Sequence, residues 1–485
     1  MVRRNRQHEI GDPPDMASNK TYEQISIGDT AEIIRECSSN DLLVFAHASG
    51  NHNPIHLPDT DWTGDGKVDK PVAPAMWVGG LASAVLGNIL PGPGTVYLTQ
   101  SFRFLGRAAV GDKIHVRVTA KEKKPDNVVV FDLSVSKDGT PLVEGVAEVR
   151  APVKTIEFDS SALPALLVQR HRHFNRMIEM AKTLPPLPTA VAAPDDPNSL
   201  EGALLAKREG LIDPILIGAR ERIEQAAKEL GESLEGLELI DIEDESEAAG
   251  KAVDLVHECR VKAVMKGHLH TDHLLHHVVK SNGGLRTKRR ISHVFVMDIP
   301  GRKTPVLISD AAINITPDLN TKVDITQNAI NAARAIGLDT PRVGILSAIE
   351  TVNPAIPSSL DAAILSKMAE RGQITGAIVD GPLAMDNAID VQAARTKGIT
   401  SLVAGRAEVL IVPNLESGNM LAKELTFIAH AEAAGLVIGA KVPVMLTSRA
   451  DDSRARLASC ALALLHTHWK ATGAPVATLD RDGEN

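Results

Sequence analysis

The most chemically suggestive segment of the chain follows the apolar run KVPVMLT near the C-terminal end. Ser448 and Arg449 come at the end of that run, and Asp451 and Asp452 follow closely. The run predicts a buried strand, and the two aspartates are typical of the first turn of a helix, where the N-terminus favours negative charge. Ligands of open α/β sheets bind beyond the carboxyl ends of the strands. A hydroxyl, a guanidinium and two carboxylates at that place predict a site for an anionic substrate.

A second strand-to-helix junction carries a lysine and a glycine. Lys266 and Gly267 follow the strand-like run VKAVM, and we expect Thr271 to be the N-cap of the next helix. A lysine, a glycine amide and a helix N-terminus together suit a phosphate group. The alternative is a strand-to-helix turn that binds nothing.

The same segment raises the alternative of a zinc site. His273 and His277 are four residues apart and would share one helix face, a spacing that can bind zinc. The cluster as a whole comprises His268, His270, His273, His276 and His277. No HExxH pattern is present and no distant carboxylate ligand is identifiable, so we expect no metal site.

Nearer the N-terminus, a helical segment gives way to SGNHNPIH, which ends at His56. Glycine, asparagine and proline cluster there as they do in tight turns. Taken alone, this pattern indicates only a turn with a hydrogen-bonded core histidine.

The elements that position these residues divide the chain into parts. Residues 1–18 predict a loose polar tail, and residues 19–158 predict antiparallel strands joined by turns at 125–127 and 138–139. The segment VAPAMWVGGLASAVLGNIL predicts a long buried helix, which such a sheet would wrap in a hot-dog arrangement. The first domain is therefore expected to be an α+β hot-dog domain.

A change of composition marks the second part. Residues 159–187 predict a linker with a helix from about Ser160 to Leu184, which the following prolines stop. In residues 188–472, short apolar runs alternate with alanine-rich helical windows, which predicts βαβ units and a largely parallel α/β sheet. Residues 473–485 predict a polar tail.

Residues from about 20 to 155 resemble the MaoC-like, R-specific enoyl-CoA hydratase family, whose motif is S-G-D-x-N-P-x-H. In that family an aspartate and a histidine activate the water that adds to an enoyl thioester, and a His-Gly backbone amide holds the thioester oxygen. Here Asn51 stands at the aspartate position, while Asn53 and His56 match the motif. The family's His-Gly pair falls on Pro74 and Ala75.

These two departures bear directly on catalysis. The amide of Asn51 cannot act as a base, and losing one positioned acid–base group costs about 10²–10⁴-fold in rate. Ala75 keeps an N–H for the oxyanion, but its Cβ restricts the backbone. The resemblance therefore implies a hydratase-like site with impaired catalysis, kept for acyl-CoA binding or for dimerisation.

The second part of the chain, residues 188–472, resembles the phosphate acetyl/butyryltransferase family along nearly its whole length. The matching blocks occur in the family's order and are Ala263–Leu275, Gly284–Pro300, Ile308–Lys322, Arg342–Ser359, Gly376–Asp390, Lys397–Leu421 and Ala433–Arg456. The resemblance implies reversible transfer of an acyl group between coenzyme A and phosphate. It also implies two subdomains of the isocitrate/isopropylmalate-dehydrogenase type with a cleft between them.

The resemblance assigns roles to individual residues. Ser448 would hydrogen-bond the sulfur of coenzyme A, Arg449 would bind the phosphoryl group, and either Asp451 or Asp452 would be the base. The family's second phosphate arginine falls near His276 and has no counterpart there. The residues expected to bind phosphate or coenzyme A are Lys266, Gly267, Thr271, Arg286, Asp310, Asn314 and Asn419, with Arg289 and Arg290 as further substitutes for the missing arginine. Other polar residues expected at strand ends are Asp380, Asn387 and Glu416, next to structural Gly381, Pro382 and Gly418.

Charge and apolar patterning exclude some classes of partner. The chain of 485 residues carries 52 basic and 61 acidic side chains, and the resulting net charge of −9 argues against nucleic acid or an anionic membrane. No apolar run approaches the roughly 18–20 residues that span a bilayer, and no secretion signal is visible, so we expect a cytoplasmic protein. The two resemblances imply a homo-oligomer, a dimer or larger, with coenzyme A and phosphate as substrates.

Four functions compete as interpretations of the sequence. No GxGxxG follows a strand, so a dehydrogenase with a nicotinamide cofactor is not supported, and we expect no permanently bound cofactor. The chain is either an acyltransferase of short acyl groups with an impaired hydratase-like domain, or a bifunctional enzyme that also hydrates enoyl-CoA. A non-catalytic acyl-CoA-binding module is disfavoured, because Ser448, Arg449 and Lys266 are all present.

Overall fold

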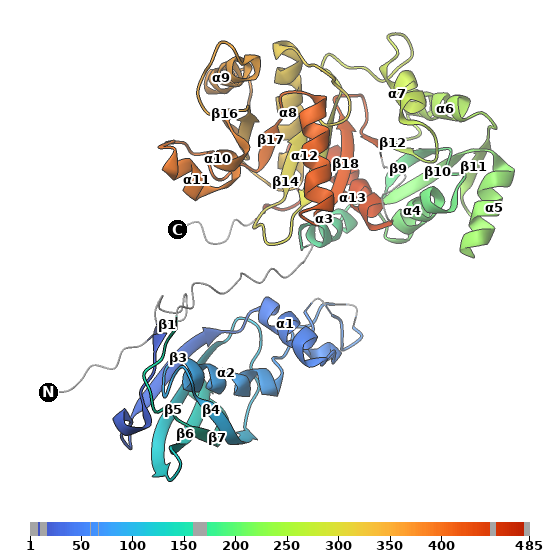
Figure 1. The fold of residues 1–485 in the computed structure, drawn as a ribbon. Coiled ribbons are helices and arrows are strands. Elements are labelled where there is room, and N and C mark those ends of the chain that lie inside the picture. Colours follow the sequence, from blue (N-terminus) through green and yellow to red (C-terminus); the bar gives the residue numbers. More distant parts are fainter. Residues whose placement is uncertain are drawn as a thin grey trace. The chain divides into compact units, whose positions relative to one another are not determined.

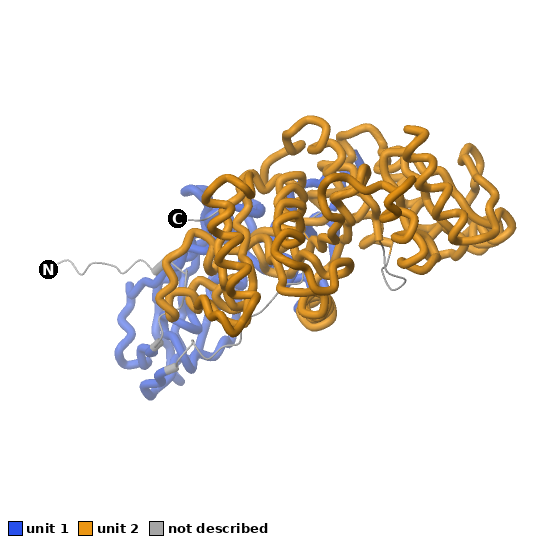
Figure 2. Tube along the Cα trace, turned by 90° about the horizontal axis from the view of Figure 1, so that it is seen from above, with its two compact units in different colours: residues 1–168 blue, residues 169–485 orange. Residues whose placement is uncertain are grey.

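The computed structural model describes residues 8–9, 17–58, 60–65, 67–158, 172–446 and 453–479. The chain forms two compact units, residues 1–168 and residues 169–485 (Figure 2). In the described part of the chain, no helix is long and apolar enough to cross a membrane.

The first unit is built on a six-stranded sheet with the strand order β1-β3-β5-β6-β7-β4. Neighbouring strands are antiparallel except for β1 and β3. The strands are β1 (His8–Glu9), β3 (Thr30–Glu36), β4 (Val96–Phe104), β5 (Lys113–Lys124), β6 (Val128–Lys137) and β7 (Thr140–Arg150). Smaller elements are a β2–β8 pair (Ala17–Ser18 and Glu157–Phe158), the 3₁₀ turns η1 (Tyr22–Gln24) and η2 (Pro54–His56), and the helix α1 (Ser39–Ser49).

The helix α2 (Ala75–Asn88) fills the concave side of this sheet, as the sequence predicted (Figure 1). Its buried side chains include Trp77, Val85 and Leu86, which share one core with alternate residues of β5 and β6. Both predicted hairpin turns are present, and the left-handed backbone of Asp138 and Gly139 is typical of a two-residue hairpin. The hot-dog arrangement is therefore confirmed.

The second unit contains an 11-stranded sheet with the order β11-β10-β9-β12-β19-β18-β13-β14-β17-β15-β16. The strands are β9 (Leu187–Ala192), β10 (Ile212–Gly218), β11 (Glu238–Asp241), β12 (Ala263–Lys266), β13 (Ser292–Asp298), β14 (Val306–Ser309), β15 (Arg342–Leu346), β16 (Ile378–Leu383), β17 (Val409–Ile411), β18 (Glu432–Ile438) and β19 (Val444–Met445). The predicted α/β architecture is confirmed, with three strands, β9, β11 and β18, that the apolar runs did not predict.

Strand direction reverses in the middle of this sheet. β12 and β19 are parallel, whereas β18 is antiparallel to both β19 and β13, and β14 is antiparallel to β13. All the other neighbours in the sheet are parallel. The sheet therefore joins two parallel halves that run in opposite directions, which fits the two expected subdomains.

Helices cover both faces of the large sheet (Figure 1). They are α3 (Arg172–Lys182), α4 (Pro197–Arg208), α5 (Arg220–Leu230), α6 (Glu245–His257), α7 (Thr271–Val279), α8 (Leu319–Ala335), α9 (Pro357–Glu370), α10 (Met385–Ile389), α11 (Val391–Thr396), α12 (Leu415–Phe427) and α13 (Ser453–Thr472). The expected linker helix is described from Arg172, and its first part lies outside the described residues. This helix belongs to the second unit and packs against α13.

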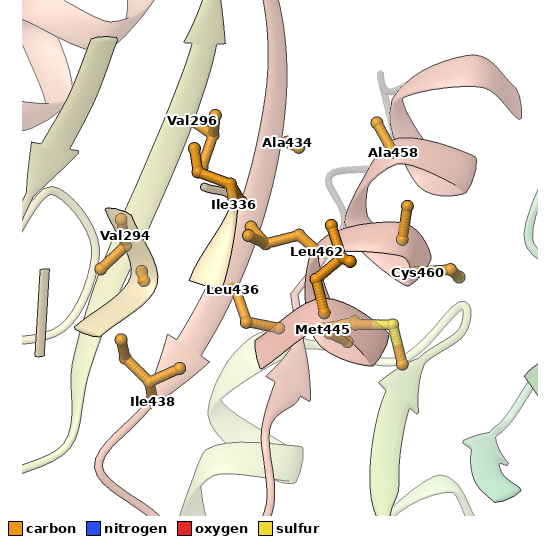
Figure 3. Packing of buried hydrophobic residues seen from close by; sticks show 14 of the residues in the cluster. Val294, Val296, Ile336, Ala434, Leu436, Ile438, Met445, Ala458, Cys460 and Leu462 are labelled. Atoms are coloured by element: carbon orange, nitrogen blue, oxygen red, sulfur yellow. The ribbon is translucent and has the colours of Figure 1, made fainter. Parts of the chain in front are cut away.

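The longest helix, α13, lies across the centre of the sheet. Figure 3 shows Leu462 of α13 among Val296 of β13 and Leu436 of β18. All three side chains are buried in one core that also includes Met445. The short strand β19 precedes residues 447–452 and α13 follows them, and both elements are held by this core. Residues 447–452 themselves lie outside the described residues.

Candidate active site

Lys266 is the last residue of β12 and is only 4% exposed. Its ammonium donates to the carbonyl oxygens of Gly267, at 3.1 Å, and Leu269, at 3.2 Å. A buried charge is costly unless it is hydrogen-bonded, so these carbonyls hold the cation in place. A fixed positive charge therefore lies at the carboxyl end of β12.

Gly267 makes the tight turn that follows. A Cβ at this position would lie 2.2 Å from the carbonyl oxygen of Ala193, so only glycine fits. The N–H of Gly267 donates to the Ala192 carbonyl at 2.8 Å, and the N–H of His268 donates to that of Ala193 at 2.7 Å. Both N–H groups therefore already have acceptors at the end of β9 and do not point to a ligand. The side chain of Lys266 is the group of this turn that can attract an anion.

The expectation that Thr271 is the N-cap of the next helix is wrong by one residue. α7 begins at Thr271, and its N-cap is His270, which has extended backbone and no side-chain capping hydrogen bond. Thr271 has helical backbone instead, and Asp272 supplies the acidic side chain of the first turn. The N–H of His273 donates to the His270 carbonyl at 3.1 Å, while the N–H groups of Thr271 and Asp272 have no acceptor within the helix.

One histidine of this segment, His277, contacts two neighbouring side chains. The ring of His277 lies 3.0 Å from the Ser246 hydroxyl and 3.3 Å from the ammonium of Lys280. Burial, together with Lys280 and His276, lowers the pKa of His277. Over the described residues, no three side chains of histidine, cysteine, aspartate or glutamate form a group that could hold a metal ion.

The segment with the expected catalytic side chains starts beside Lys266. Met265 of β12 pairs with Met445 of β19, so the chain leaves β19 next to the end of β12. Ser448, Arg449, Asp451 and Asp452 themselves lie outside the described residues. The described chain resumes at Ser453, the first residue of α13.

Asp310 and Asn314 form a compact loop at the end of β14. Asp310 is 2% exposed, and its carboxylate accepts from the Asn314 amide group at 2.6 Å and from the backbone N–H groups of Ala312 and Asn314. The N–H of His293 also donates to it, at 3.3 Å. Asn419 lies close by on α12 and donates to the Ala311 carbonyl at 3.3 Å. Asp310 thus orders this loop through several hydrogen bonds.

The expected binding residues fall into two groups. The directions of the intervening strands make β14 antiparallel to β12, so the carboxyl ends of these two strands lie at opposite ends of the sheet. The row of strand ends that includes Lys266 is called the Lys266 edge, and the row at the other end of the strands is the opposite edge. Lys266, Gly267 and the carboxyl end of β19 lie at one edge. The other edge carries Asp310, Asn314 and Asn419, and Arg286 lines a cavity there together with Asn314.

The remaining polar residues of the expected set serve the local structure. Asp380 lies inside β16 and accepts from the N–H of Gly381 at 2.8 Å and from the Ser401 hydroxyl. Asn387 is buried in α10 and donates to Glu350 at 3.3 Å. Glu416 and Gly418 lie in the first turns of α12, and a Cβ at Gly418 would lie 2.8 Å from the Asp310 carbonyl oxygen.

Sequence reasoning missed an acidic residue at the Lys266 edge. The side chain of Asp195 is 4% exposed, pairs with Arg222 at 2.7 Å and lies 3.3 Å from the ring of His268. It follows β9, whose sequence LPTAVA was not predicted as a strand. The run DDP could have indicated this residue. Its second aspartate, Asp196, caps the helix α4 that follows, so the strand end and Asp195 come directly before that helix.

In the first unit, the SGNHNPIH segment leads from α1 into η2. The ring of His56 lies 2.7 Å from the Val72 carbonyl through Nδ1. A carbonyl only accepts, so Nδ1 is the donor in this contact, which fixes the orientation of the ring. Asn53 caps η2, and its own N–H donates to the Asn51 side chain at 3.3 Å. Ala75 begins α2, so its N–H has no acceptor within the helix.

Comparisons with known proteins agree with both parts of this architecture. A family model described as "Phosphate acetyl/butaryl transferase" matches residues 245–464, and one described as "MaoC like domain" matches residues 7–137. A phosphate acetyltransferase of Rhizobium meliloti is 57% identical over 293 residues, which cover 60% of this chain and 93% of that protein.

More distant relatives match the same part of the chain. A phosphate butyryltransferase of Clostridium acetobutylicum is 40% identical over 61% of this chain and 98% of that protein. The crystal structure of a branched-chain phosphotransacylase from Enterococcus faecalis V583 is 31% identical with a TM-score of 0.52, over 58% of this chain and 99% of that one. The chain therefore belongs to the phosphate acetyl/butaryl transferase family and carries a MaoC-like domain in its N-terminal part.

Proposed function

We propose that the chain reversibly transfers a short acyl group, acetyl above all, between coenzyme A and phosphate. One observation carries the proposal for the site: the segment that contains Ser448 and Arg449 leaves β19 beside β12, which ends at the buried Lys266. The preference for acetyl is supported by the 57% identity to a phosphate acetyltransferase, against 40% to a phosphate butyryltransferase.

In the proposed reaction, the thiol of coenzyme A gives its proton to Asp451 or Asp452, and the sulfur attacks the carbonyl carbon of the acyl phosphate. A C–S bond forms, the bond from that carbon to the phosphate oxygen breaks, and inorganic phosphate leaves. Ser448 hydrogen-bonds the sulfur, and Arg449 binds the phosphoryl group bidentately. Coenzyme A and phosphate are substrates, and no permanently bound cofactor is needed.

The remaining residues at this edge position the site. Lys266 keeps a positive charge near the phosphoryl group without direct exposure. Gly267 makes the turn possible, and the N-terminal turn of α7 at Thr271 presents backbone N–H groups that favour an anion. Asp310 and Asn419 order the loops of the other subdomain.

The N-terminal domain is proposed to be hydratase-like but weak in catalysis, because Asn51 offers no base. The alternative, a bifunctional enzyme that also hydrates enoyl-CoA, is favoured by one observation. His56 donates through Nδ1 to the Val72 carbonyl at 2.7 Å, which orients the ring as such contacts orient catalytic histidines.

We also propose that the protein is a cytoplasmic homo-oligomer. The outer strand β4 has almost all its residues exposed, and α12 exposes Met420 and Phe427 seven residues apart. Such apolar surfaces are typical of contacts between subunits. The cytoplasmic location is supported by three free cysteines, Cys37, Cys259 and Cys460.

The decisive test is thiol release from acetyl-, propionyl- and butyryl-CoA in the presence of phosphate. We expect activity in the full chain, with acetyl-CoA preferred, and a loss of about 10²–10³-fold in Arg449→Gln. Arg395→Gln, an exposed arginine on α11, is the matched control. Absence of phosphate-dependent release with all three thioesters would reject the function, and an unchanged rate in Arg449→Gln would reject the site.

A further inference from the structure

A cavity of about 600 Å³ lies at the sheet edge opposite the proposed transfer site. It opens between the end of α7 and the start of α8, so both subdomains contribute to it. Its lining comprises Val279, Arg286, Thr287, Lys288, Arg289, Arg290, Ile291, Ile313, Asn314, Asp318, Asn320, Thr321 and Asp324. A volume of this size suits a nucleotide-sized molecule rather than a single inorganic ion.

The charge of the cavity is positive. Four basic side chains, from Arg286 and from 288–290, face two carboxylates, Asp318 and Asp324. Both carboxylates have partners of their own. Asp318 caps α8 through the Thr321 N–H at 2.8 Å, and Asp324 accepts from the Arg290 N–H at 2.9 Å.

Most of the basic side chains are available to a ligand. Lys288 makes no ion pair or hydrogen bond with any residue that the structure describes, and Arg286 has only a 3.4 Å contact to the Ser281 hydroxyl. Arg289 is 3.9 Å from Asp324. Several cations that face one concave surface without full neutralisation raise the local concentration of multivalent anions.

Helix α8 adds to this field. It has 17 residues and begins at Leu319, so its N-terminal turn, with Asn320 and Thr321, lines the cavity. The Asp318 carboxylate takes the Thr321 N–H of this turn, and the positive end of the helix dipole favours phosphate groups beside it. The helix terminus and the basic loop thus act on the same volume from two sides.

We propose that this cavity binds a small molecule that carries at least two phosphate groups, of the nucleotide class, as a site separate from the transfer site. Separation follows from the strand directions, which put the cavity and Lys266 at opposite edges of the sheet. The nucleotide end of coenzyme A has the same chemistry as a free nucleotide, and the test below distinguishes the two sources.

The cavity loop is joined to the segment that leads into the transfer site. The Thr287 hydroxyl donates to the Gly439 carbonyl at 2.6 Å, Arg286 forms a backbone bridge with Ala440, and the Lys441 N–H donates to Leu285 at 2.8 Å. Residues 439–441 belong to the connection 439–443 between β18 and β19, and β19 precedes Ser448 in the sequence. A ligand in the cavity therefore regulates transfer through this connection, a consequence that rests on the proposed function.

The test measures binding directly, by calorimetry on the full chain with pyrophosphate, ADP and adenosine 3′,5′-bisphosphate. We expect at least one probe to bind, with affinity that falls as salt rises. The variant Lys288→Gln/Arg289→Gln should weaken it tenfold or more. The control variant Lys228→Gln/Arg371→Gln removes the same charge from α5 and from the end of α9, and it should bind as the parent does. Thermal unfolding verifies that both variants are folded.

Two further measurements separate the outcomes. The probe should still bind when acetyl-CoA is saturating, whereas loss of probe binding through competition would assign the cavity to the substrate and overturn the separate site. Absence of binding by all three probes, or full binding by Lys288→Gln/Arg289→Gln, also overturns it. A bound probe should change the thiol-release rate of the parent, and an unchanged rate overturns the regulation. Binding without any thiol release would reject the proposed function while leaving the site intact.

Discussion

The backbone N–H of Phe174 donates to the carboxylate of Asp298 at 2.9 Å, with both residues fully buried. Phe174 lies in the first turn of α3, and Asp298 is the last residue of β13. The carboxylate thus satisfies a helix N-terminal donor and complements the positive end of the helix. This contact anchors α3 to the carboxyl end of β13, a central strand of the sheet, next to the N-terminal end of α13.

Removing that carboxylate should destabilise the second unit. We expect Asp298→Ala to lower the free energy of unfolding by about 1–3 kcal/mol, because a buried N–H loses its acceptor. Chemical denaturation of the full chain measures this. Asp213→Ala, an exposed aspartate of β10, should stay within about 0.5 kcal/mol of the parent. The anchor would be disproved by an Asp298→Ala variant that matches this control.

The buried ring of His466 predicts a loss of stability in mild acid. His466 lies on α13 beside Trp469, and burial lowers the pKa of its ring to about 4. In the unfolded chain the ring titrates near pH 6.5, so below that pH the unfolded state binds the extra proton. Stability therefore falls as pH falls from about 6.5 towards 4, and His293, whose pKa burial also lowers to about 4, acts in the same direction.

A single substitution isolates this contribution. Between pH 7 and pH 5, His466→Phe should lose about 2 kcal/mol less stability than the parent, because it has no ring to protonate on unfolding. The measurement is the free energy of unfolding from urea denaturation at both pH values. His52→Gln, an exposed histidine in the first unit, should keep the dependence of the parent. An identical pH dependence in His466→Phe would contradict the prediction.

Much of this fold could be predicted from apolar patterns, because the strands of α/β units are short runs of buried residues. The runs that became β12 and β13 were predicted in this way, as was the buried helix α2. β18 was missed because its sequence EAAGLVI begins with small residues that also suit a helix. The reversal of strand direction at β18 could not be predicted, because an apolar run does not show whether its strand pairs with its neighbours in a parallel or an antiparallel direction.

The arrangement of the candidate site could be predicted only in part, for the same reason. Lys266 and Gly267 were found because a strand, a turn and a helix follow one another locally. Asp310 and Asn314 were expected in the same cleft, but whether two strand ends share an edge depends on sheet order. That order is set by pairing between distant segments, and the sequence of one strand does not record its neighbours.

Restoring the carboxylate at position 51 should restore hydration. The Val72 carbonyl holds Nδ1 of His56, and the amide of Asn51 cannot supply the acid–base partner that the family motif places at that position. We expect Asn51→Asp to raise the rate of crotonyl-CoA hydration by about 10²–10⁴-fold. Asn127→Asp, in the β5–β6 turn, is the control. An enzyme-like rate in the parent, or no gain in Asn51→Asp, would reject the idea of an impaired site.

Exposure of β4 predicts how copies of the first unit associate. β4 is the outer strand of its sheet, and Val96 and Leu98 are 54% and 41% exposed. A long, apolar edge strand offers unpaired backbone groups to a second copy, and lysines along such an edge oppose pairing. Val96→Lys/Leu98→Lys should therefore lower the molar mass measured by light scattering, while Ile27→Lys, which changes another exposed apolar residue, should not. A mass equal to that of the parent at every concentration would exclude this edge as an interface and leave the exposed face of α12 as the place where subunits meet.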